Sequence, residues 1–201
     1  MDRYLSLDGP SEGSYKEKGS KFLAYAYPVS SEEEVKVRIN ALKKEHYNAR
    51  HHCYAYILGG DGSKYRAYDD GEPRHSAGDP ILNQIKSSGC LDVLVVVVRY
   101  FGGTKLGKSG LINAYKLATK EALSNANVID KVPMAHFQIN FDYEGMQDVM
   151  HTLQQYENRI TDQQFEETCS LICQVPEAVA GMLMHELKKF NSVKQVIRLS
   201  R

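Results

Sequence analysis

Apolar runs in the first 132 residues predict a sheet of several strands. The most apolar run of the chain, 91–98, consists of Leu and Val around one Asp, which favours a strand at the centre of a sheet. Gly59-Gly-Asp-Gly62 separates two shorter runs, and such a glycine-rich segment predicts a hairpin. The strands predicted in this region cover 21–29, 52–58, 64–68 and 91–98.

Three segments of the same region have the signatures of helices. Ser31 followed by Glu34 is a capping box, which predicts the start of a helix. Asp79-Pro80 predicts a second helix, with Asp79 as the N-cap and Pro80 at the first helical position. A third helix is expected after a glycine-rich loop, with one face formed by Leu111, Ala114, Tyr115, Ala118 and Ala122.

From Pro133 onward the pattern predicts a second domain. Its elements follow one another in the order β-α-β-β-α-β, which is the ferredoxin-like split motif. The predicted fold class is therefore α+β, with domains at 1–132 and 133–201. The expected strands are 135–141, 159–165, 168–175 and 193–199, and the expected helices are 143–156 and one that begins at Pro176.

Composition is that of an ordinary globular protein. Hydrophobic residues make up 42% of the 201 residues and charged residues 25%, which excludes disordered and collagen-like chains. No run approaches the 18 apolar residues of a transmembrane helix, so no membrane partner is expected. The first residues lack the pattern of a secretory signal, so we expect a cytoplasmic protein. We interpret its cysteines as reduced thiols and expect Cys169 and Cys173 to face one core.

The net charge is zero, but the charges are unevenly distributed. Residues 1–132 contain 19 Lys and Arg against 16 Asp and Glu, whereas 133–201 contain 6 against 9. A segment of the first domain contains basic residues and no acidic one, and such a local positive field favours an anionic partner. Its basic residues are Arg99, Lys105, Lys108, Lys116 and Lys120.

The glycine-rich loop contains a literal Walker A match. Gly102 is followed by four residues and then by Gly107-Lys108-Ser109, between a predicted buried strand and a helix. Backbone N–H groups at a helix N-terminus attract phosphate, so the loop could bind a nucleotide or the phosphate backbone of a nucleic acid. The glycines could also serve only to let a strand-to-helix turn pack tightly.

Acidic, histidine and cysteine side chains gather in two further stretches. Asp69, Asp70 and Glu72 could bind a metal, take part in acid–base chemistry, cap a turn, or pair with Arg99 or Arg74. The second stretch, His51-His52-Cys53, could supply a zinc site or a nucleophilic Cys–His pair together with His75. Adjacent histidines on a strand point to opposite faces, so only one of them could join such a site. These residues are His51, His52, Cys53 and His75.

Taken together, these stretches resemble the YigZ/IMPACT family in its two-domain bacterial form. The resemblance covers essentially the whole chain. It implies an N-terminal domain of the fold shared by ribosomal proteins, elongation factor domain IV and GHMP kinases, and a ferredoxin-like C-terminal domain similar to the late domains of elongation factor G. The motifs that carry it are Asp69-Asp70-Gly71-Glu72-Pro73, Ala77-Gly78-x-Pro80-Ile-Leu and Val96-Val-Val-Arg99-Tyr-Phe-Gly-Gly103-x-Lys105-Leu-Gly107.

Two positions depart from the family pattern. Arg74 and His75 stand where small residues are usual before the Ala-Gly pair, and Lys108-Ser109 replaces Thr/Ala-Gly after the loop. The Lys-Ser of the Walker A match is therefore not a family feature.

The family's eukaryotic members look like translation regulators that act through protein contacts. We therefore expect a non-catalytic, translation-associated regulator that binds RNA or the ribosome, with no cofactor, metal or catalytic residue assigned. The alternatives are a phosphate-ligand or nucleotide-binding enzyme at the glycine loop, a hydrolase at the His/Asp/Glu cluster, and a protein-interaction module that uses the ferredoxin-like sheet. Residues expected to bind nucleic acid or another anion are Arg99, Gly102, Gly103, Lys105, Gly107, Lys108, Gly110 and Lys116, and those expected to line or brace the cleft are His51, Asp69, Asp70, Glu72 and Arg74.

Overall fold

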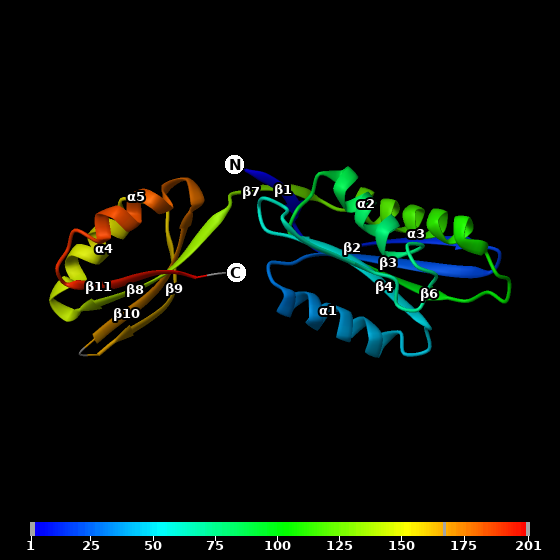
Figure 1. Ribbon diagram of the computed structural model, residues 1–201, viewed down its shortest axis with the longest axis horizontal. Helices are drawn as coiled ribbons and strands as arrows, with labels where there is room; N and C mark the ends of the chain where they lie inside the picture. Colours follow the sequence, from blue (N-terminus) through cyan, green and yellow to red (C-terminus); the bar gives the residue numbers. More distant parts are fainter. Residues whose placement is uncertain (1–2, 167, 200–201) are drawn as a thin grey trace. The chain divides into compact units, whose positions relative to one another are not determined.

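The computed structural model describes residues 3–166 and 168–199 and contains two compact units (Figure 1). The N-terminal unit comprises residues 4–131, and the C-terminal unit continues from Val132. Both units combine strands and helices, which confirms the predicted fold class. That the segments 1–132 and 133–201 fold as independent domains stays a prediction.

A five-stranded sheet forms the centre of the N-terminal unit, and all its neighbouring strands are antiparallel. Its middle strand is β6, the most apolar run of the sequence, and residues 93–98 of this strand are fully buried. The hairpin predicted at Gly59–Gly62 joins β4 to β5. In spatial order the strands are β2 (Ser11–Glu17), β3 (Ser20–Pro28), β6 (Val93–Tyr100), β4 (His51–Leu58) and β5 (Lys64–Tyr68).

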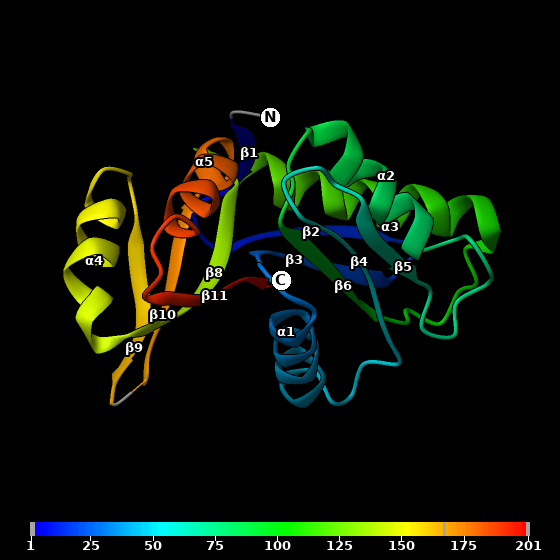
Figure 2. The same ribbon diagram turned by 60° about the vertical axis from the view of Figure 1, so that its left-hand side comes forward.

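Helices cover both faces of this sheet (Figures 1 and 2). Helix α1 (Glu32–Glu45) packs on one face and begins at the predicted N-cap Ser31, whose hydroxyl accepts from the backbone N–H of Glu34. Helices α2 (Gly78–Ser88) and α3 (Gly107–Ser124) pack on the other face. The predicted inner face of α3 is confirmed, because Leu111, Ala114, Tyr115, Ala118 and Ala122 are all buried.

Three strands of this unit were not predicted. Strand β1 (Tyr4–Leu7) pairs with β7 (Val128–Lys131), and β2 forms an edge of the sheet. Strand β2 is hard to recognise because Tyr15 is its only large apolar residue. Helix α3 packs against this strand so closely that a Cβ on Gly13 would lie 2.3 Å from the backbone nitrogen of Ala122.

The prediction for the start of α2 was wrong. The helix begins at Gly78 with Ala77 at the cap position, so Asp79 lies inside the first turn. Asp69, from the preceding loop, supplies the cap instead: its Oδ1 accepts from the backbone N–H groups of Ala77 and Gly78 at 3.0 and 2.8 Å. The carboxylate that caps α2 thus comes from Asp69 in the preceding loop, and not from Asp79 as the Asp-Pro pattern predicted.

The C-terminal unit has the predicted β-α-β-β-α-β order, and its sheet is ordered β11-β8-β10-β9. Helices α4 (Met146–Gln154) and α5 (Glu177–Leu187) cover one face, and a short 3₁₀ turn, η1 (Tyr143–Gly145), precedes α4. Cys169 and Cys173 both lie in the core between helices and sheet, as predicted. The strands are β8 (Met134–Asp142), β9 (Arg159–Phe165), β10 (Thr168–Pro176) and β11 (Val193–Leu199).

The helices of the described chain are all too short or too polar to cross a bilayer.

His52 is expected to make the stability of the N-terminal unit depend on pH. Its side chain is 5% exposed on the α1 side of the sheet, and its Nε2 has no hydrogen-bond partner among the described residues. Burial lowers the pKa of His52, while Asp70 raises it and Lys43 lowers it further. Below the unfolded-state pKa of about 6.5, the unfolded chain takes up a proton that the folded chain does not. Stability is therefore expected to fall as the pH drops through this value.

The matched variants are His52→Gln and His185→Gln, the second at an exposed histidine. Urea unfolding at about pH 7.5 and about pH 5.5 should show a smaller loss of stability in His52→Gln than in the wild type. His185→Gln should behave like the wild type. An unchanged loss in His52→Gln would show that protonation of His52 is not the cause.

Candidate functional site

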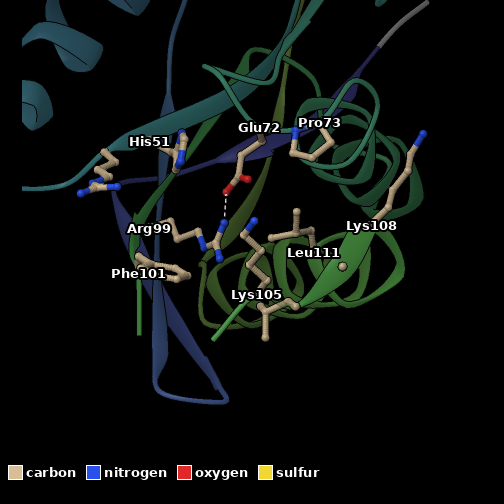
Figure 3. A pocket seen from close by; sticks show the side chains of 11 residues that line it. His51, Glu72, Pro73, Arg99, Phe101, Lys105, Lys108 and Leu111 are labelled. Atoms are coloured by element: carbon tan, nitrogen blue, oxygen red, sulfur yellow. Dashed lines mark hydrogen bonds and ion pairs between the residues drawn. The ribbon is translucent and has the colours of Figure 1, made fainter. Parts of the chain in front are cut away.

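A pocket of about 400 Å³ brings together the three stretches that the sequence singled out (Figure 3). It lies where the start of β4, the β5–α2 loop, the end of β6 and the start of α3 meet. Its lining combines basic and apolar side chains. The lining residues are Arg50, His51, Glu72, Pro73, Arg99, Phe101, Lys105, Leu106, Gly107, Lys108 and Leu111.

A buried ion pair forms one wall of the pocket. Arg99 Nη1 donates to Glu72 Oε1 at 2.6 Å, and the two residues are only 6% and 9% exposed. Tyr115, from α3, donates its hydroxyl to the same carboxylate oxygen at 2.8 Å. This confirms the pairing of the acidic stretch with Arg99 that the sequence left open. Arg99 is thus fixed in orientation, and Figure 3 shows the pair facing the amino group of Lys105.

Cys53 lies against the Tyr115 hydroxyl and is not placed to act as a nucleophile. Its Sγ is 2.9 Å from the carbonyl oxygen of Asp69 and 3.3 Å from the Tyr115 hydroxyl. The side chain is fully buried, and this burial raises the pKa of the thiol far above its ordinary value. The alternative of a nucleophilic Cys53–His pair was therefore wrong: the thiol is kept protonated and serves the packing.

Asp69 and Asp70 brace the loop that carries Glu72. Burial pushes the pKa of Asp69 upward, but backbone hydrogen bonds from Gly78, His75 and Ala77 outweigh it and lower the pKa overall. Asp70 Oδ2 accepts from the backbone N–H of His52 at 2.7 Å. Neither residue lines the pocket, so both act by holding its wall in place.

The glycine loop supplies the opposite side of the pocket. Gly103 and Gly107 adopt positive φ angles of 89° and 72°, and a Cβ on either would meet no atom within 4 Å. Helix α3 begins at Gly107, and no side chain caps its first turn. Lys105 and Lys108 flank this start; in Figure 3, Lys105 extends toward the Arg99–Glu72 pair, whereas Lys108 points away from it. The uncapped backbone at the start of α3 and the two lysines together favour the binding of an anion.

Several predicted site residues lie outside the pocket lining. Gly102 packs against the backbone of Gly19, Lys116 is exposed farther along α3, and His75 Nδ1 pairs with Asp79 at 2.6 Å. The residues predicted from the sequence fall into two groups. Those that line the pocket are Arg99, Lys105, Gly107, Lys108, His51 and Glu72, and those that do not are Gly102, Gly103, Gly110, Lys116, Asp69, Asp70 and Arg74.

Sequence reasoning missed five lining residues. Arg50 belongs to the His-rich stretch and could have been included for its charge. Phe101 lies inside the glycine loop, where an aromatic side chain is a signal for surface binding. The remaining three had no signal of their own in the sequence, because Pro73, Leu106 and Leu111 read as turn or core residues.

Two alternatives from the sequence can be compared with this geometry. A P-loop nucleotidase domain has a parallel sheet, whereas β6 is antiparallel to both of its neighbours, so the Walker A match does not stand in a P-loop fold. Within residues 3–166 and 168–199, no three His, Cys, Asp or Glu side chains are grouped closely enough to hold a metal. Of the candidate ligands, Cys53, Asp69 and His75 bond instead to protein groups, as described above.

Comparisons with known proteins find relatives over nearly the full chain. Residues 18–123 match the family profile described as "Impact N-terminal domain". The chain is 32% identical to "IMPACT family member YvyE" of Bacillus subtilis, over 98% of this chain and 91% of that protein. It is 30% identical to "IMPACT family member YigZ" of Escherichia coli, over 95% of each. A solved structure described as that of a hypothetical protein is similar over 100% of this chain and 99% of its own, with a TM-score of 0.77 and 28% identity.

Proposed function

Because the chain belongs to the IMPACT family, we propose that it is a non-catalytic, translation-associated factor of the cytoplasm that binds RNA or the ribosome. The pocket of the N-terminal unit is the contact surface in this proposal. Arg50, Lys105 and Lys108 supply the charge for phosphate groups, since the charge of Arg99 is balanced by Glu72, and the exposed backbone at Gly107 lets the phosphates approach closely.

The observation that carries the proposal is the charge of the pocket lining. Among the described residues that line it, four are cationic and one is a carboxylate, and that carboxylate is already neutralised by Arg99. Desolvated walls beside such charges strengthen the attraction of an anion. Binding is favoured over catalysis because the acid, base and thiol candidates Glu72, Asp69 and Cys53 are all engaged in bonds within the protein.

The double variant Lys105→Ala/Lys108→Ala tests the proposal. Each lysine that meets a phosphate contributes about 0.7 to the salt slope of single-stranded binding, so the slope should become shallower by about 1.4. Affinity should fall at every salt concentration. The measurement is fluorescence anisotropy of a labelled single-stranded RNA, titrated with protein at several salt concentrations.

The matched control is Lys43→Ala/Lys44→Ala, which removes two exposed lysines from α1 on the other face of the sheet. This control should retain the wild-type slope. Lys116→Ala, made separately, tests whether the contact extends along α3 as the sequence suggested. Equal slopes for the wild type and the Lys105/Lys108 variant would remove the pocket from the interface and favour a protein partner instead.

A further inference from the structure

The pocket has an apolar side that phosphate contacts alone do not use. Pro73, Leu106, Leu111 and the ring of Phe101 line it together with the basic residues. Phe101 is 47% exposed, and it differs from the other exposed aromatic residues in that it lines this pocket. These apolar side chains offer no favourable contact to a phosphate group. A flat ring system could bury its faces against them and stack on the ring of Phe101.

Phe101 is held in place through the buried ion pair. The guanidinium carbon of Arg99 lies 5.7 Å from the centroid of the Phe101 ring and 5.4 Å from that of Phe22. Because Glu72 fixes Arg99, the guanidinium supports Phe101 beside the pocket opening. An aromatic ring that is exposed yet positioned is the feature with which proteins stack unpaired bases.

We propose that the pocket binds one unpaired nucleotide of a single-stranded RNA, with its base against Phe101 and its phosphate at the lysines beside the start of α3. This inference rests on the proposed function and names the form of RNA that it requires. The volume of about 400 Å³ falls within the range of small-ligand sites. Bases inside a duplex are stacked and paired, so only a splayed-out nucleotide can enter.

The test compares Phe101→Ala with Phe101→Tyr, which keeps an aromatic face. The probes are a short single-stranded oligoadenylate, a duplex RNA and inorganic polyphosphate, which carries charge but no bases. Phe101→Ala should weaken binding of the oligoadenylate by roughly 5- to 150-fold, the equivalent of one lost base stack. Binding of duplex RNA and of polyphosphate should not change. Phe101→Tyr should bind all three probes like the wild type.

The salt dependence separates this inference from the proposed function. Phe101→Ala removes no phosphate contact, so its salt slope should equal that of the wild type, unlike the slope of Lys105→Ala/Lys108→Ala. Tyr47→Ala, at another exposed aromatic residue, is the control for general surface effects. Thermal unfolding of each variant checks that the fold is kept.

Two results would overturn the inference while leaving the proposed function standing. In one, Phe101→Ala binds the oligoadenylate as well as the wild type does while the lysine variant loses affinity. In the other, Phe101→Ala weakens binding of oligoadenylate and polyphosphate equally. If the wild-type protein binds no RNA probe, both the inference and the RNA form of the proposed function fail.

Discussion

Replacing Glu72 with glutamine is expected to lower the free energy of unfolding by about 3 to 5 kcal/mol, since it breaks a buried ion pair by removing one partner. Glutamine has nearly the shape of glutamate and retains an oxygen for the Arg99 and Tyr115 donors, so packing changes little. What changes is the charge: Arg99 is 6% exposed and would keep a positive charge with no anion beside it. The cost is that of an uncompensated charge away from water.

The matched control for this variant lies in the C-terminal unit. Glu177→Gln breaks a Glu–Arg pair with the same 2.6 Å separation, made with Arg198, but there both side chains are about half exposed. Exposed pairs of this kind contribute no more than about 1 kcal/mol. Urea unfolding followed by circular dichroism compares the two variants with the wild type. Equal small losses for both would mean that water reaches the Glu72–Arg99 pair.

Gly102→Ala is expected to lower the free energy of unfolding by about 3 kcal/mol or more, because an added Cβ collides with backbone that cannot give way. That Cβ would lie 1.9 Å from the carbonyl carbon of Gly19 and 2.2 Å from the backbone nitrogen of Ser20. The two segments are also joined by a hydrogen bond from the Gly102 N–H to the Ser20 hydroxyl at 3.1 Å. Relief of the clash therefore requires the β2–β3 turn to separate from the glycine loop.

The neighbouring Gly103 provides the control for Gly102. It has a φ of 89° but open space around its Cα, so Gly103→Ala meets only backbone strain, which costs about 1 to 2 kcal/mol. Thermal unfolding should rank the wild type above Gly103→Ala and both above Gly102→Ala. The reverse order for the two variants would show that the Gly19 contact opens without cost.

Much of the fold was predictable because its elements have strong local patterns. The β4–β5 hairpin, the central strand β6, the inner face of α3 and the β-α-β-β-α-β order of the C-terminal unit all follow from spacing and turn residues. Strands β1, β2 and β7 were missed because their pairing partners, rather than their own side chains, determine them. The cap of α2 was misassigned for a similar reason, since Asp69 reaches it from outside the helix.

The candidate site was predictable as a set of stretches but not as a geometry. Charge and glycine content directed attention to Arg99, Lys105 and Lys108, and all three line one pocket. Spacing could not show that Glu72 neutralises Arg99, or that Gly102 packs against the backbone of Gly19. Phe101 had a sequence signal in its place inside the glycine loop, but only the structure shows that it lines the same pocket as the lysines.

The pairing of β1 with β7 places the first and last strands of the N-terminal unit side by side, with Tyr4 opposite Lys131. Such adjacent ends suit circular permutation, since a short linker could join them and new ends could be opened in a surface loop. The pairing also determines how the unit responds to tension. A pull on the chain at these two residues acts first on the Tyr4–Lys131 pair and then on the pairs that follow it. The bridge between Leu5 and Cys90 passes part of this load to the segment that leads into β6.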